Sequence, residues 1–186
     1  MARTIAYSFV ETNVTDLKFQ EDLYDFIAGA SRIAILGVGN DLRTDDGLGL
    51  VIVSNLKHLE GPSLLVENVG SVPEAFAGNL SKFGAERVVM VDAADMLKPP
   101  GHIELITKDR IGGITLSTHR MPLSLLMQFL EDRTGARCIV LGVQPKSIEF
   151  GEGLTPEIRA EAEKIISTLE IMLKQHLRGI EDVQDD

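Results

Sequence analysis

The sequence predicts an α/β fold, in which a mostly parallel, twisted, five-stranded sheet lies between helices in a three-layer domain. The first observation is that short apolar runs alternate along the chain with segments of helical periodicity, which is typical of parallel sheets covered by helices on both faces. The second is that the runs "RIAILGV" (32–38), "ERVVMVDA" (86–93) and "RCIVLGV" (137–143) lack polar alternation. Strands that are buried on both faces have this composition.

The N-terminal half is predicted to contain three helices and two strands. The first helix begins after Thr15, a residue type suited to the N-cap position. Gly84 ends the third helix, because glycine adopts the left-handed conformation that follows many helices at no steric cost. In chain order, the elements are a helix at 16–30, a strand at 32–38, a helix at 47–60, a strand at 63–69 and a helix at 72–84.

The C-terminal half begins with the apolar strand at 86–93 and a short edge strand at 102–106. The segment 107–120 has no clear period and is predicted to be a loop. Pro122 then opens a helix, because proline is favoured in the first helical turn. After the strand at 137–143, apolar residues at spacings of three and four predict a last helix that begins behind Thr155 and Pro156 and ends at Gly179.

The domain organisation follows from length and composition. A chain of 186 residues fits one domain, which we place at 31–178, between an N-terminal extension with a helix (1–30) and an acidic, flexible tail (179–186). The formal net charge of −10 argues against nucleic acid or an anionic membrane as partner. We find no apolar run of membrane-spanning length and no secretory signal, so we expect a cytoplasmic protein. Cys138, the single cysteine, lies in an apolar run and is predicted to be buried and inert.

Carboxylates follow the first and third predicted strands. The stretch "GVGNDLRTDDGLG" (37–49) begins like a phosphate-binding turn, but Leu42 takes the place of the third glycine and three aspartates fill the turn. Asp45 is interpreted as a cap of the next helix. Asp92 ends the third strand, and Gln144 follows the fifth. Because ligands bind beyond the carboxyl ends of parallel strands, we expect Asp46 and Asp92 to share one edge of the sheet.

His119, in "STHRMP", precedes a helix in the predicted loop, where functional residues are often found. Two carboxylates and one imidazole suit a divalent transition metal such as nickel, zinc or iron. The same aspartates could work without a resident metal, because proximity raises the pKa of one of them and the resulting acid and carboxylate pair can activate water. The spacing of the residues does not separate these two chemistries.

Four ordered motifs, "GVGNDLRTDDGLG", "VVMVDAADM", "STHRMPLSLL" and "VLGVQP", together resemble the hydrogenase maturation proteases, in particular the subgroup that processes hydrogenase 3 of the formate hydrogenlyase type. The resemblance spans about 32–173. It implies a phosphorylase/hydrolase-like fold and an aspartic-type endopeptidase that removes a C-terminal peptide from the large subunit of a nickel-iron hydrogenase. It also implies that cleavage follows nickel insertion, so that the substrate brings the metal and the protease has no cofactor of its own.

The resemblance also implies roles for particular residues. By motif position, Asp46, Asp92 and His119 contact the nickel, and Asp46 and Asp92 are the catalytic candidates. Residues expected to bind the substrate backbone are Gly37, Gly39, Asn40 and Gln144. Two other hypotheses stay open from the residues alone, namely a metallohydrolase that holds its own divalent metal and a nickel-binding maturation factor without proteolytic activity.

Overall fold

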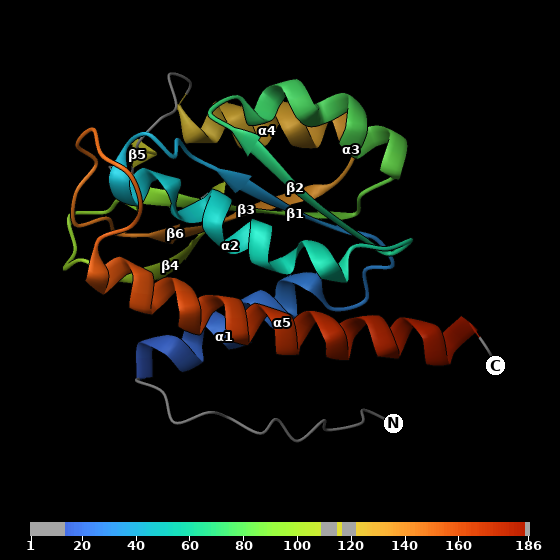
Figure 1. Cartoon of the computed structure of the whole chain (residues 1–186). Coiled ribbons are helices and arrows are strands. Elements are labelled where there is room, and N and C mark those ends of the chain that lie inside the picture. Colours follow the sequence, from blue (N-terminus) through green and yellow to red (C-terminus); the bar gives the residue numbers. More distant parts are fainter. Residues whose placement is uncertain (1–13, 109–114, 117–121, 185–186) are drawn as a thin grey trace.

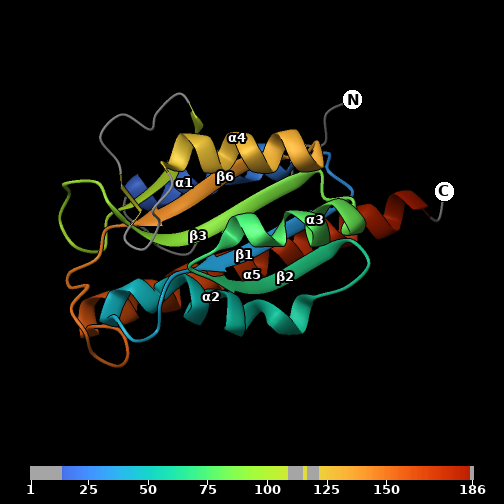
Figure 2. The same ribbon diagram turned by 90° about the horizontal axis from the view of Figure 1, so that it is seen from above.

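The structure is a computed structural model, and it describes residues 14–108, 115–116 and 122–184 (Figure 1). A central sheet is covered by helices on both faces, which confirms the predicted three-layer α/β fold. Helices α1, α2 and α5 lie on one face, and α3 and α4 lie on the other (Figures 1 and 2). Among the described residues, no helix has the length and apolar composition that crossing a membrane requires.

The sheet has the strand order β2, β1, β3, β6, β4. The first four strands of this order are parallel, and β4 runs antiparallel to β6 at one edge. This agrees with the predicted mostly parallel sheet with a short edge strand. The strands are β1 (Ile33–Val38), β2 (Leu64–Gly70), β3 (Arg87–Asp95), β4 (Ile103–Ile106) and β6 (Arg137–Val143).

A two-residue strand, β5 (Thr115–Leu116), lies within the segment predicted to be loop. It pairs antiparallel with the last two residues of β3, Ala94 and Asp95. The pairing of β3 with β6 ends one residue earlier, at Ala93. The end of β3 therefore extends past the parallel ladder, and its backbone groups pair with a short piece of a distant loop that has no sequence periodicity of its own.

The helices form two separate hydrophobic cores with the sheet. One core joins α1, α2 and α5 to one sheet face, and the other joins α3 and α4 to the opposite face. Cys138 is buried in the second core, and burial raises the pKa of its thiol to about 12. The helices are α1 (Val14–Ile27), α2 (Leu48–Leu56), α3 (Ala77–Phe83), α4 (Leu123–Thr134) and α5 (Pro156–Gln184).

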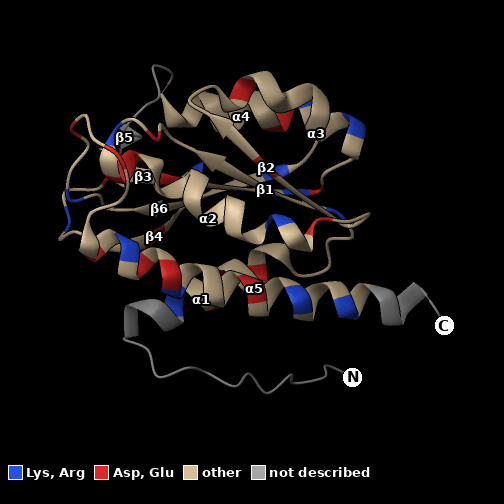
Figure 3. Ribbon diagram, viewed as in Figure 1, with Lys and Arg blue, Asp and Glu red and all other residues tan. Residues whose placement is uncertain are grey.

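The predicted helix ends agree with the structure at one glycine and disagree at another. Gly84 follows α3 with a φ of 75°, and its N–H donates to the carbonyls of Leu80 and Ser81, as predicted. The predicted end at Gly179 is wrong, because α5 continues to Gln184 and Gly179 has no left-handed backbone. A glycine inside a helix costs only about 1 kcal/mol, which a helix of this length tolerates. Acidic and basic residues are interspersed along α5 (Figure 3).

The N-terminal helix α1 packs on the domain. Leu23, Phe26 and Ile27 are buried in the same core as the inner side of α5. Arg87 in β3 donates from Nε to the Phe26 carbonyl at 2.8 Å, and the guanidinium groups of Arg87 and Arg137 lie over the Phe26 ring. The helix predicted in the N-terminal extension is therefore part of the hydrophobic core of the domain.

Candidate active site

The turn after β1 folds tightly against the start of α2. Its first residues leave no room for side chains, because a Cβ atom at Gly39 would lie 1.9 Å from the carbonyl oxygen of Asp46. A Cβ at Gly37 would lie 2.6 Å from the carbonyl oxygen of Gly49. Asn40 donates its N–H to the same Asp46 carbonyl at 3.1 Å, and its side chain accepts the Leu42 N–H. These residues thus bring the chain close to itself, and their contact with a substrate stays a prediction.

Three short 3-10 turns interrupt the connections: η1 (Thr44–Gly47), η2 (Lys57–Leu59) and η3 (Pro73–Phe76). The first of them, η1, carries Asp45 and Asp46, which are both fully buried. It contacts β3, the strand that contains Asp92. The two site aspartates therefore come from adjacent elements at the carboxyl ends of β1 and β3, as the sequence predicts.

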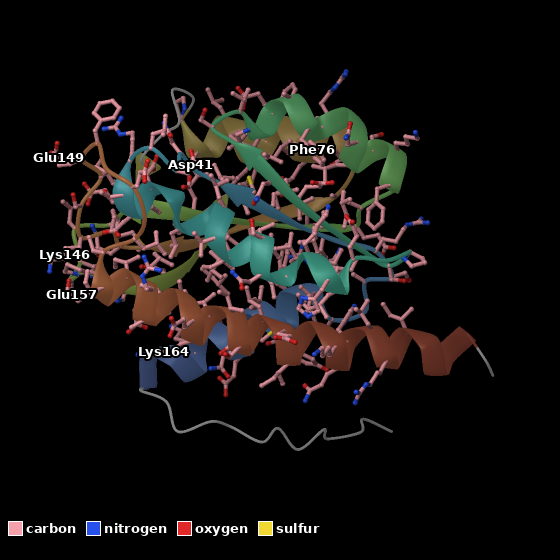
Figure 4. The ribbon with its side chains drawn as sticks, in the orientation of Figure 1. Asp41, Phe76, Lys146, Glu149, Glu157 and Lys164 are labelled. Carbon is pink, nitrogen blue, oxygen red and sulfur yellow. The ribbon has the colours of Figure 1, made fainter. Side chains whose placement is uncertain are left out.

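Asp45 is not a helix cap. Neither η1 nor α2 has a side-chain hydrogen bond at its cap, and the Asp45 carboxylate instead accepts hydrogen bonds from the loop that joins β6 to α5. The donors are the backbone N–H groups of Lys146 at 3.0 Å, Ser147 at 2.9 Å and Thr155 at 2.7 Å, and the Thr155 hydroxyl at 3.1 Å. Asp45 thus anchors η1 to this loop, which Lys146 further ties to α5 through an ion pair with Glu157 (Figure 4).

Asp92 lies one residue beyond the end of the ladder between β1 and β3. The ladder between β1 and β3 ends with the pair Gly37 and Val91, whereas Asp92 still pairs with Gly142 on its other side. The side chain is fully buried, and among the described residues neither carboxylate oxygen has a hydrogen-bond partner of normal geometry. A buried carboxylate in such surroundings is costly in free energy, which is typical of functional sites.

The electrostatics of the site couple the two aspartates. Burial raises the pKa of Asp92 well above its usual value, and the negative charge of Asp46 raises it further. The Ala93 backbone N–H lowers this pKa but makes the smallest of the three contributions. Asp92 therefore holds a proton more readily than an aspartate in water, and a cation that approached both carboxylates would favour its ionised form.

His119 lies outside the described residues, so the structure does not test the predicted trio with Asp46 and Asp92. Among the residues that are described, no three His, Cys, Asp or Glu side chains gather in a way that could hold a metal ion. The described part of the site is thus a pair of carboxylates, and the contact of His119 with nickel stays a prediction.

Gln144 lies at the same edge of the sheet, but its side-chain amide forms hydrogen bonds with the end of β3 and the loop that follows it. It is 8% exposed, and its Oε1 accepts the N–H groups of Met96 at 2.7 Å and Lys98 at 3.2 Å. Its Nε2 donates to Asp95 at 3.3 Å. The side chain therefore shapes the loop after β3, and binding of substrate by Gln144 stays a prediction.

A groove of about 390 Å³ adjoins η1. Asp41 lies at this edge of the molecule (Figure 4). The groove is formed by η1, α2, the end of β2 and the loop before α5, and no local motif predicts that these four segments meet. Its lining residues include Asp41, Thr44, Val51, Ser54, Asn68 and Leu154.

Comparison with known proteins shows which family the chain is similar to. A family model described as hydrogenase maturation protease matches residues 51–172. The hydrogenase 3 maturation protease of Escherichia coli is 32% identical over 137 residues, which cover 73% of this chain and 87% of that protein. These matches confirm the resemblance that the sequence motifs indicate.

Solved structures give the same result. The crystal structure of a nickel-iron hydrogenase maturation protease from Thermococcus kodakarensis has a TM-score of 0.74 and 32% identity, over 82% of this chain and 99% of that one. The solution structure of an endopeptidase from Escherichia coli has a TM-score of 0.64 and 31% identity, over 75% of this chain and 89% of that one. The similarity thus includes the fold as well as the sequence.

Proposed function

The chain belongs to the hydrogenase maturation protease family, and on that premise we propose that it removes a C-terminal peptide from the nickel-loaded large subunit of a nickel-iron hydrogenase. The endopeptidase activity is that of the family. The aspartic type of the catalysis, the recognition of nickel and the location in the cytoplasm are parts of the proposal.

The buried pair of Asp46 and Asp92 is the observation that supports the proposal most directly. Both side chains are fully buried at the carboxyl edge of the sheet, and the charge of Asp46 raises the pKa of Asp92. Two carboxylates that disfavour each other's ionisation form a site that a divalent cation would stabilise. A nickel ion carried by the substrate would supply that charge at the moment of docking.

Nickel in this proposal is a part of the substrate. Asp46, Asp92 and, by motif position, His119 would contact it, and oxygen and imidazole nitrogen are donors that nickel accepts. Docking would place the scissile peptide bond beside the carboxylates. Binding of the metal would thereby also position the bond for cleavage. A precursor without nickel would leave the two carboxylates without a counter-charge and would dock poorly.

The hydrolytic step that we propose uses one carboxylate of the pair as general base and acid. The carboxylate takes a proton from water while the water oxygen forms a bond to the scissile carbonyl carbon. When the carbon–nitrogen bond breaks, the same carboxyl group gives this proton to the leaving amine. Each aspartate has two oxygens, so contact with the cation through one leaves the other for the proton.

The test is a cleavage assay with nickel-loaded and nickel-free precursor, read by mass analysis of the released peptide. We expect the parent protein to shorten the loaded precursor and to leave the empty one intact. Asp92→Asn should abolish cleavage, whereas Glu163→Gln, a change of an exposed carboxylate on α5, should leave it unchanged. Cleavage of the nickel-free precursor at the same rate would contradict recognition of nickel, and a stoichiometric, tightly bound metal in the purified protein would favour a resident metal.

A further inference from the structure

Four exposed apolar side chains lie in loops at the edge of the sheet that holds Asp46 and Asp92. They are exposed to 60% at Leu42, 49% at Val72, 86% at Leu97 and 82% at Phe150. Each lies in the loop that follows a different parallel strand, namely β1, β2, β3 and β6. Because these strands are parallel neighbours in the sheet, the four loops all begin at the edge that holds the carboxylates. We refer to the four residues as the apolar rim.

Leu97 is held in a conformation that leucine disfavours. Its φ is +56°, in the left-handed region that glycine and asparagine adopt more easily. The side chain is also the most exposed large apolar one among the described residues, so the fold gains little from packing it. Non-glycine residues with left-handed backbone tend to occur at functional sites, where another requirement offsets the strain.

The loop around Leu97 is fixed by hydrogen bonds on both sides. Gln144 accepts the N–H of Met96 and that of Lys98, and the Leu97 N–H donates to the Asp95 carboxylate at 3.2 Å. Gln144 also joins the far end of this loop, because its carbonyl accepts the Gly101 N–H at 2.9 Å. Leu97 is thus presented to solvent by a braced turn, which reduces the entropy lost when a partner covers it.

The loops that carry Leu42 and Phe150 are joined to each other. Gly151 donates its N–H to the Leu42 carbonyl at 3.1 Å, and its own carbonyl accepts the Thr44 N–H at 2.9 Å. The guanidinium of Arg43 lies 5.4 Å from the centre of the Phe150 ring. Leu42 therefore lies in the same turn as Asp46, four residues before it, and Phe150 lies in a loop that is hydrogen-bonded to that turn.

We propose that the apolar rim is the docking surface for the folded body of the hydrogenase large-subunit precursor, with Leu97 and Phe150 as its anchors. The inference rests on the proposed function, because the precursor must come close to the site to bring a bond to Asp46 and Asp92. A partner that reaches buried carboxylates through the edge of the sheet has to cover the loops of that edge. Burial of exposed apolar and aromatic side chains is the main source of affinity in such interfaces.

The experiment uses Leu97→Asn, since asparagine tolerates the left-handed backbone but removes the apolar contact. With nickel-loaded precursor, we expect KM to rise at least about fivefold while kcat stays within about twofold. The thermal midpoint should not fall, because the substitution relieves backbone strain and exposes no core. Phe150→Ser should act in the same direction. The matched control is Ile171→Gln, which removes a 47% exposed apolar side chain from the middle of α5, roughly 22 Å along the helix from its start.

Binding of precursor to the Asp92→Asn variant, measured by surface plasmon resonance with and without Leu97→Asn, separates docking from cleavage. If the parent does not cut the precursor but binding still depends on Leu97, the result supports the docking surface and contradicts the proposed function. If the parent cuts normally and both rim variants keep the parental KM, the docking proposal is wrong. A dimer of this chain in light scattering that Leu97→Asn dissociates would instead assign the rim to self-association and overturn the proposal.

Discussion

Replacing Asp92 with asparagine should stabilise the fold at neutral pH while it abolishes processing. Asp92 is fully buried, and burial together with the charge of Asp46 raises its pKa in the folded state above the unfolded value of 3.8. Above this pH the unfolded chain releases the proton that the folded state retains. The free energy of unfolding of the parent protein therefore falls as pH rises from about 3.8 through the raised pKa of Asp92.

The magnitude follows from what the buried carboxylate lacks. A buried polar group without hydrogen-bond partners of normal geometry costs about 1 to 3 kcal/mol, and asparagine carries no charge for Asp46 to repel. For a domain of this size, each kcal/mol shifts the thermal midpoint by about 2 to 4 °C. We therefore expect Asp92→Asn to raise the midpoint by about 2 to 12 °C at pH 7 and to differ little from the parent at pH 4.

The assay is thermal denaturation of the parent and the variant between pH 4 and pH 8, with Asp22→Asn, a change of an exposed aspartate on α1, as control. The control should give the same difference from the parent at every pH. The reasoning is refuted if Asp92→Asn is no more stable than the parent at pH 7, or if its advantage does not grow with pH. Loss of processing alone would not support the predicted gain in stability, because a misfolded site would also be inactive.

Two further substitutions test contacts that hold η1 and α1 in place. Asp45→Ala leaves three partly buried backbone N–H groups of the loop before α5 without their acceptor. We therefore expect a loss of about 3 to 5 kcal/mol, measured as a fall in the urea midpoint. Asp41→Ala in the same turn should cost less than about 1 kcal/mol. Phe26→Ala removes a buried ring from beneath Arg87 and Arg137 and should cost about 3 to 5 kcal/mol, with processing at low temperature retained; unchanged stability would mean that α1 is dispensable.

The strands and the edge that they form could be predicted from the sequence, because an apolar run without alternation is a local signal. Asp46 and Asp92 follow such runs, and the geometry of parallel strands then brings them to one edge. The role of Asp45 could not be predicted in the same way. Its partners lie 101 to 110 residues further along the chain, and a local capping rule has no access to them. The same reason applies to Gln144, whose partners in the loop after β3 lie 46 and 48 residues earlier.

The left-handed backbone of Leu97 could not be predicted from the sequence either. Nothing in "DMLKPPG" (95–101) distinguishes Leu97 from any other apolar residue after a strand. Its left-handed backbone arises because Gln144 accepts hydrogen bonds from the residues on both sides of it. Such a turn is set by a side chain from another strand, so that only the folded chain reveals an exposed leucine as a candidate for contact with a partner.

The adjacent aspartates of η1 have opposite energetic roles, and the site depends on this difference. Asp45 accepts four hydrogen bonds and thereby fixes η1 to the loop before α5. Asp46, one residue later, is then held near Asp92 although the charges of the two carboxylates repel each other. The favourable contacts of Asp45 offset the repulsion between Asp46 and Asp92, because Asp45 and Asp46 are neighbours in η1 and η1 contacts β3, the strand of Asp92. A chain without the Asp45 anchor could relax by moving η1 away from β3, and the carboxylate pair that we propose to meet the substrate would be lost before any contact with nickel was made.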